Sequence, residues 1–280
     1  MTELGYLGLP KLDVAVARSV DDAVRMIERE GYIVMAGGTY VLSSITMGVN
    51  KARKLLDISN LDELRFIRES QDRVEAGALT THNQLVEKLG DRIPTLKSFW
   101  RCYSSPVVSN RATLGGSIML KNCSEDIIPI MLALDAELVF QTSRGEQRSK
   151  LHEFLQQRST QPMLLKSVVF AKKPNCFFEK LWLGVSRIPI MSVALSFVQQ
   201  DGRLEEVRVA VSHHSLSLPN RVYPVERFLQ GRTLDRQTAV KASQLMAQSI
   251  NPSDDVVAPA WYRREAAGVL LGRLLTGAGG

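Results

Sequence analysis

Two glycine pairs constrain the fold of this 280-residue chain more than any other feature. The first, Gly37-Gly38, directly follows a short apolar run that has the pattern of a buried strand. A chain that turns there exposes successive backbone N–H groups at the start of a helix-like segment, and such groups bind an anion without a basic side chain. The second pair, Gly115-Gly116, repeats this pattern. Two such turns in one domain fit the two phosphates of a pyrophosphate, although either pair alone also fits an ordinary tight turn.

Helix and strand patterns surround the first turn. Ser19 begins a capping-box pattern, apolar residues then recur at helical spacing, and Gly31 ends the helix. Strands are expected at 54–59 and 73–79, and a short helix is expected at 80–90. These short elements make the N-terminal part of the chain rich in strands.

A further helix signal follows the second turn. Ser124, Glu125 and Asp126 are expected to supply the cap and the first-turn acids of a helix over 127–134. Pro129 fits this helix because a residue in the first turn loses no hydrogen-bond partner for its missing N–H.

The pattern changes in the last third of the chain. Two alternating runs meet at Asp201-Gly202, which is a strong signal for a β-hairpin. Two helices, at 235–250 and 260–275, are expected after the hairpin.

The order of these elements predicts the fold class and the domains. A length of 280 residues corresponds to roughly two domains of about 150 residues. We predict an α+β chain with one domain at 1–172 and a smaller domain of antiparallel sheet and helices at 173–280.

Composition excludes several classes of protein. The formal net charge is +6, but acidic and basic residues are interleaved and no aromatic residues alternate with them, which argues against a nucleic-acid partner. No apolar run approaches the roughly 18 residues of a membrane helix, so membrane insertion is not expected. Cys102, Cys123 and Cys176 form no CxxC pair, and the first residues lack a signal-peptide pattern. A reducing cytoplasm is therefore the expected location.

The motifs of several other sites are missing from the sequence. The chain contains no GxGxxG after a strand, no GxxxxGK[ST], no HExxH and no GxSxG. His213 and His214 are adjacent on an expected strand, so their side chains would point to opposite faces and would not share a metal ion. We expect no metal site in this chain.

Two charged residues are further candidates for a ligand site. Asp126 has two candidate roles that are compatible with each other: a functional one, in which it accepts hydrogen bonds from ribityl or ribose hydroxyls, and a structural one, in which it complements the helix dipole. Lys180 lies in an aromatic and aliphatic run that has a strand pattern. It is either an ordinary lysine whose stem lies along apolar surface or a cation directed at a flavin ring.

Taken together, these segments resemble one protein family. The strings AGGT, LLDISNLDELRFI, GALTTH and ATLGGSI, followed by SEDIIPIMLALDAELVF, are similar to the FAD-binding medium subunit of molybdenum hydroxylases, the xanthine dehydrogenase and carbon monoxide dehydrogenase group. The C-terminal string AWYRREAAGVLLGRLL resembles the last helix of that family. The likeness runs from about Ala23 to Leu275 and therefore covers nearly the whole chain.

The resemblance implies a fold and a site. The fold would be a vanillyl-alcohol-oxidase-type FAD-binding domain of two α/β subdomains, followed by a small C-terminal domain. Two loops would hold the FAD pyrophosphate, and two charged residues would lie near the ribityl chain and the flavin. By residue match the cofactor-binding residues are Ala36, Gly37, Gly38, Thr39, Tyr40, Thr113, Gly115, Gly116, Ser117, Asp126 and Lys180.

The resemblance also implies a role as an electron-transfer subunit. A large subunit would carry the molybdenum cofactor, a small subunit would carry 2Fe–2S clusters, and FAD on this chain would pass electrons to NAD or another acceptor. No side chain of this chain would act as a general acid or base, because the cofactor carries the redox chemistry.

Three residues depart from the family pattern. Tyr40 stands where Asp or Ser is frequent, Ser117 stands where Asn is usual, and Leu183 replaces an arginine. Two alternatives therefore remain open. One is a stand-alone flavin oxidoreductase that uses a nicotinamide donor, and the other is a flavin-free scaffold subunit of the same complex.

Overall fold

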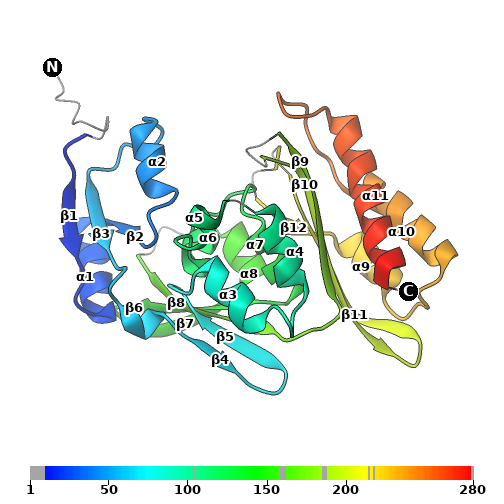
Figure 1. Cartoon of the computed structure of the whole chain (residues 1–280), viewed down its shortest axis with the longest axis horizontal. Coiled ribbons are helices and arrows are strands. Elements are labelled where there is room, and N and C mark those ends of the chain that lie inside the picture. Colours follow the sequence, from blue (N-terminus) through cyan, green and yellow to red (C-terminus); the bar gives the residue numbers. More distant parts are fainter. Residues whose placement is uncertain are drawn as a thin grey trace.

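Three β-sheets organise the chain (Figure 1). The computed structural model describes residues 10–103, 105–157, 162–184, 188–213, 215–216 and 218–278. The first sheet is parallel with the order β1-β3-β2, the second is antiparallel with the order β4-β5-β8-β6-β7, and the third is antiparallel with the order β12-β11-β10-β9. The strands are β1 Asp13–Val16, β2 Ile33–Met35, β3 Lys54–Asp57, β4 Ile67–Glu69, β5 Arg73–Gly77, β6 Glu137–Thr142, β7 Gly145–Lys150, β8 Leu164–Ala171, β9 Cys176–Leu183, β10 Ile188–Gln200, β11 Arg203–Ser212 and β12 Asn220–Arg221.

Helices cover each sheet. They are α1 Val20–Glu30, α2 Val41–Thr46, a 3-10 helix at Asp62–Leu64, α3 His82–Leu89, α4 Thr95–Cys102, α5 Pro106–Ser109, α6 Leu114–Met119, α7 Ile127–Ala133, α8 Leu151–Gln156, α9 Tyr223–Leu229, α10 Arg236–Ser249 and α11 Ala260–Ala278. The mixture of helices with antiparallel sheets confirms the α+β class predicted from the sequence.

The first sheet and α1 form the N-terminal layer. The Ser19 hydroxyl accepts a hydrogen bond from the Asp22 N–H, and Gly31 ends the helix with a φ of 66°, as the sequence predicts. Apolar residues of α1 pack against β3 in a small core of their own. Strand β1 was not among the predicted elements, because four residues carry little pattern.

Helix α7 lies at the centre of the molecule. All seven of its residues are buried, and its core cluster joins the second sheet to Phe178, Ala194 and Ala210 of the third sheet. Pro129 lies in its first turn, as predicted, but Ser124 is not its cap. The N-cap residue is Asp126, and its side chain makes no capping hydrogen bond because it is used elsewhere.

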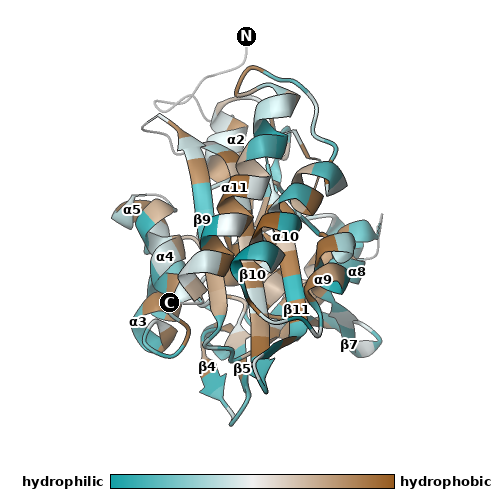
Figure 2. Cartoon of the chain, turned by 90° about the vertical axis from the view of Figure 1, so that its right-hand side faces the viewer, coloured by the Kyte–Doolittle hydropathy of each residue, from teal (hydrophilic) through white to brown (hydrophobic). Residues whose placement is uncertain are grey.

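The hairpin β10–β11 turns at Asp201 and Gly202, whose φ angles are 49° and 74°. Two residues with positive φ fit the tight turn that the Asp-Gly pair predicts. Figure 2 looks onto this part of the chain and shows α10 and α11 lying over β9, β10 and β11. The buried faces of these helices and strands make a second large core.

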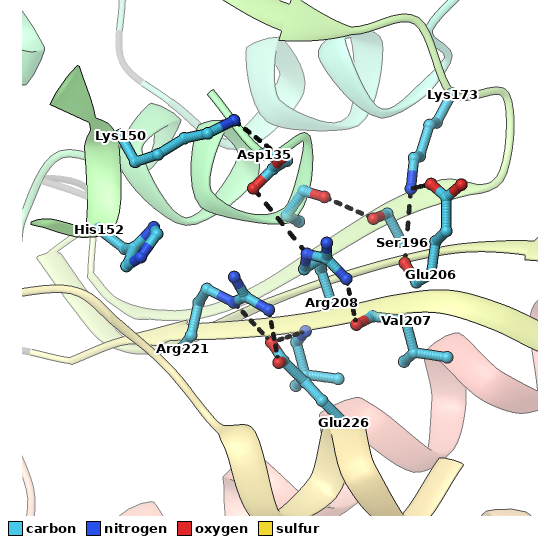
Figure 3. Close-up of polar contacts among 12 residues, drawn as sticks. Asp135, Lys150, His152, Lys173, Ser196, Glu206, Val207, Arg208, Arg221 and Glu226 are labelled. Atoms are coloured by element: carbon cyan, nitrogen blue, oxygen red, sulfur yellow. Dashed lines mark hydrogen bonds and ion pairs between the residues drawn. The ribbon is translucent and has the colours of Figure 1, made fainter. Parts of the chain in front are cut away.

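Ion pairs join the end of α7 and β7 to the third sheet (Figure 3). Lys150 donates to Asp135 at 3.2 Å, and Asp135 lies 4.0 Å from the guanidinium of Arg208 on β11. Beside them, Arg221 donates to both carboxylate oxygens of Glu226, at 2.8 Å and 2.6 Å. The Asp135–Arg208 pair links the region of the second sheet to the third, whereas the Arg221–Glu226 pair attaches α9 to the third sheet.

Within the part of the chain that the structure describes, no helix is both long and apolar enough to cross a membrane.

Candidate functional site

A cleft with a volume of about 370 Å³ lies where the ends of the first sheet meet α6. Ligand sites in proteins commonly enclose about 300–1,000 Å³, so this volume suits a small molecule or part of a larger one. The cleft brings together nine of the eleven residues predicted from the sequence: Ala36, Gly37, Gly38, Thr39, Tyr40, Thr113, Gly115, Gly116 and Ser117.

The first glycine turn presents unused hydrogen-bond donors to this cleft. The backbone N–H groups of residues 37–40 donate to no acceptor among the described residues. Gly38 has a φ of 74°, which only glycine adopts easily, and α2 begins three residues later. Successive free N–H groups in such a turn form a concave site for an anion.

The second glycine turn is built differently from the prediction. Its N–H groups are already used: Leu114 donates to Thr80, Gly115 donates to Ala78, and Gly116 donates to the Thr113 hydroxyl at 3.1 Å. The expectation that this turn exposes a second row of free N–H groups is therefore wrong. The cause is a long-range contact with the segment after β5, which supplies the two backbone acceptors.

Glycine is needed at both turns because other backbone atoms approach closely. A Cβ at Gly37 would lie 1.8 Å from the carbonyl oxygen of Arg111, and a Cβ at Gly115 would lie 2.7 Å from the Cβ of Ala78. The Arg111 side chain also donates to the Gly37 carbonyl at 3.2 Å. Gly37 therefore packs against the segment that leads into the second turn, Gly115 packs against the segment after β5, and both turns line the cleft.

Asp126 and Lys180 lie apart from the cleft wall. The Lys180 ammonium donates to an Asp126 carboxylate oxygen, and each side chain is only 2% exposed. Neither residue lines the cleft. In this structure each of the two predicted charged residues has the other as its partner, so a direct contact of either with a cofactor stays a prediction.

Burial dominates the electrostatics of this pair. It raises the pKa of Asp126 to about 6, although the Lys180 ammonium acts in the opposite direction. The second carboxylate oxygen of Asp126 is buried and has no hydrogen-bond partner among the described residues.

Tyr103 and Glu125 are among the further lining residues that the sequence analysis did not assign to the site. Burial raises the pKa of Glu125 to about 7, and the nearby Asp126 charge also raises it, while the Ser117 hydroxyl and Lys180 lower it. Burial likewise raises the pKa of Tyr103. In the sequence, only its position beside Asp126 pointed to Glu125 as a site residue. A favourable interaction with the helix dipole accounted for both acids without any ligand.

His82 supports this end of the cleft from behind. Its ring is fully buried, in edge contact with Phe99 and Tyr103, and its Nε2 lies 3.2 Å from the Ser117 hydroxyl. Burial lowers the pKa of His82 to about 3, so the ring is neutral. The string GALTTH therefore contributes a structural residue that holds Ser117 in place.

The three residues that depart from the family pattern lie in different parts of the structure. Tyr40 is 40% exposed and lines the cleft, and Ser117 is buried at its floor. Leu183, at the end of β9, is exposed and does not line the cleft. His214 lies outside the described residues. The expectation that His213 and His214 point to opposite faces of a strand therefore stays a prediction.

Matches to two protein families define the class to which this chain belongs. The family described as the FAD binding domain in molybdopterin dehydrogenase matches residues 10–171, and the CO dehydrogenase flavoprotein C-terminal domain matches residues 184–278. The chain belongs to this family of FAD-binding medium subunits of molybdenum-dependent oxidoreductases.

Full-length relatives agree with this assignment. The glyceraldehyde dehydrogenase medium chain of Sulfolobus acidocaldarius is 24% identical over 272 residues, which cover 93% of this chain and 96% of that protein. The carbon monoxide dehydrogenase medium chain of Hydrogenophaga pseudoflava is 23% identical and covers 96% of this chain and 97% of its own length. A solved carbon monoxide dehydrogenase from Hydrogenophaga pseudoflava has the same fold, with a TM-score of 0.89, 22% identity and coverage of 96% and 98%.

Proposed function

We propose that this chain binds FAD in the cleft, receives electrons from 2Fe–2S clusters on a small subunit and passes them to NAD or another acceptor. A large subunit with the molybdenum cofactor would oxidise the substrate. Residues 1–172 would form the FAD-binding domain and residues 173–280 the C-terminal domain. A cytoplasmic location is part of the proposal and rests on the sequence.

The row of free N–H groups at residues 37–40 carries the proposal. A pyrophosphate brings negative charge and several acceptor oxygens, and these N–H groups supply donors without a basic side chain. Gly115 and Gly116 add no side chains to the lining of the cleft, which gives an extended ligand room beside them. When FAD is bound, it supplies the redox chemistry, and the chain supplies position and electrostatics.

The first experiment is the visible absorption spectrum of the purified chain, with the cofactor identified after heat denaturation. We expect flavin bands and FAD in nearly equimolar amount. A colourless protein that takes up no added FAD would contradict the proposal and favour the flavin-free scaffold.

A matched pair of variants tests the turn itself. Gly38 and Gly202 have the same φ of 74°, but only Gly38 lines the cleft. Both G38A and G202A should lose about 1–2 kcal/mol of unfolding free energy, because a Cβ disfavours this backbone conformation. Only G38A should bind FAD at least tenfold more weakly. Equal FAD dissociation constants for the two variants would show that this turn does not hold the cofactor.

A further inference from the structure

Glu125 is a half-buried acid that lines the cleft, and one of its two carboxylate oxygens has no hydrogen-bond partner among the described residues. It lines the cleft wall, and its Oε2 atom is shielded from water and makes no hydrogen bond to the described residues. An orphaned buried carboxylate oxygen is costly, so such a group usually awaits a ligand or carries a proton.

Among the described residues, Lys180 is the cation that acts on Glu125, and it offsets the effect of burial only in part. The ammonium of Lys180 is held by Asp126, and Asp126 adds a second carboxylate beside Glu125. Tyr103 from α4 and Ser117 from α6 are neutral neighbours. Behind Ser117, His82 from α3 is held neutral by burial.

This arrangement favours the protonated form of Glu125. Burial disfavours the charged carboxylate, and repulsion by Asp126 acts in the same direction. The pKa of about 7 places the loss of the proton within the range of ordinary buffers.

We propose that Glu125 contacts the bound flavin nucleotide as a neutral acid that donates a hydrogen bond, and that loss of its proton weakens flavin binding. This inference rests on the proposed FAD site. The reason is electrostatic: the FAD pyrophosphate brings negative charge to residues 37–40 of the same cleft, where an ionised Glu125 would repel it. The ionised group would also lose the O–H that donates.

The test is the FAD dissociation constant of the full chain between pH 5.5 and 8.5, measured by the change in flavin fluorescence. For the wild type we expect a constant value at the acid end and a rise of up to tenfold per pH unit above the pKa. E125Q keeps a hydrogen-bond donor but has no side-chain proton to lose near pH 7, so the rise of its dissociation constant above pH 7 should be absent. E87Q removes an exposed acid on α3 outside the cleft and should keep the wild-type profile.

The outcomes are distinct. A wild-type dissociation constant that does not change with pH, or an E125Q profile parallel to that of the wild type, overturns the role of Glu125. Failure of every variant to bind FAD at any pH contradicts the proposed function instead. If E125Q does not fold, infrared difference spectra of the wild type still decide the matter. FAD should shift the C=O stretch of a protonated carboxylic acid, and an unchanged band would overturn the proposal.

Discussion

Single residues at the cleft show why glycine recurs there. Gly38 has a left-handed backbone, whereas Gly37 and Gly115 have no room for a Cβ because backbone or Cβ atoms of other segments lie against them. The sequence predicts that both pairs are special. The sequence does not show whether the N–H groups of a turn are free or already donate hydrogen bonds. At the second turn the acceptors, the carbonyls of Ala78 and Thr80, belong to another segment of the chain.

The buried ring of His82 predicts a pH-dependent stability. Its pKa falls from an ordinary value of 6.5 to about 3 in the folded chain. The unfolded chain therefore binds a proton at a higher pH than the folded chain does. The stability contributed by neutral His82 is complete above pH 6.5 and is lost as the pH falls toward 3, at up to about 1.4 kcal/mol per pH unit.

Urea unfolding at several pH values measures this contribution. Between pH 6.5 and 4, the unfolding free energy of H82Q should fall less steeply than that of the wild type. H152Q, at a partly exposed histidine on α8, should keep the wild-type slope. Equal slopes for the wild type and H82Q would mean that another group sets the acid stability.

At the scale of elements, the helices and strands that have strong local sequence signals were predicted correctly. The capped helix α1 and the hairpin at Asp201-Gly202 are confirmed because their signals lie within a few residues. The short strands β1 and β4 were missed, since three or four residues show little periodicity. The cap of α7 was wrong because the side chain of Asp126 pairs with Lys180, which lies 54 residues away in the chain.

Helix α9 is attached to the third sheet by a buried ion pair. Glu226 receives two hydrogen bonds from Arg221 and a third, at 2.9 Å, from the N–H of Val209 on β11. E226A would leave the guanidinium and this N–H without their partner, so it should cost about 3–5 kcal/mol of unfolding free energy. The exposed pair Glu179–Arg273 is the control, and E179A should cost less than about 1 kcal/mol. Similar losses in denaturant unfolding would show that the buried pair is not special.

At the scale of the whole molecule, the cleft is assembled from segments that are far apart in sequence. The turn after β2, the residue after α4, the start of α6 and Glu125 from the segment before α7 meet there. The resemblance to the medium subunits identified the two turns, because their strings are local. Tyr103 and Glu125 became visible only in the folded chain, since nothing in their local sequence connects them to residues 37–40. The domain limits at residue 172 stay a prediction.

The composition of the purified assembly distinguishes the three functions that the sequence allows. If the chain is an electron-transfer subunit, an affinity-tagged copy isolated from its native host should bring molybdenum, iron and FAD with it, and elemental analysis with flavin determination measures all three. FAD without molybdenum and iron would identify a stand-alone flavoenzyme, while both metals without FAD would identify a scaffold. The G38A variant sharpens the result, because its added Cβ disturbs the turn that lines the cleft and leaves the residues outside the cleft unchanged. It should lose FAD and retain both metals, and simultaneous loss of all three would show that FAD binding and assembly are coupled.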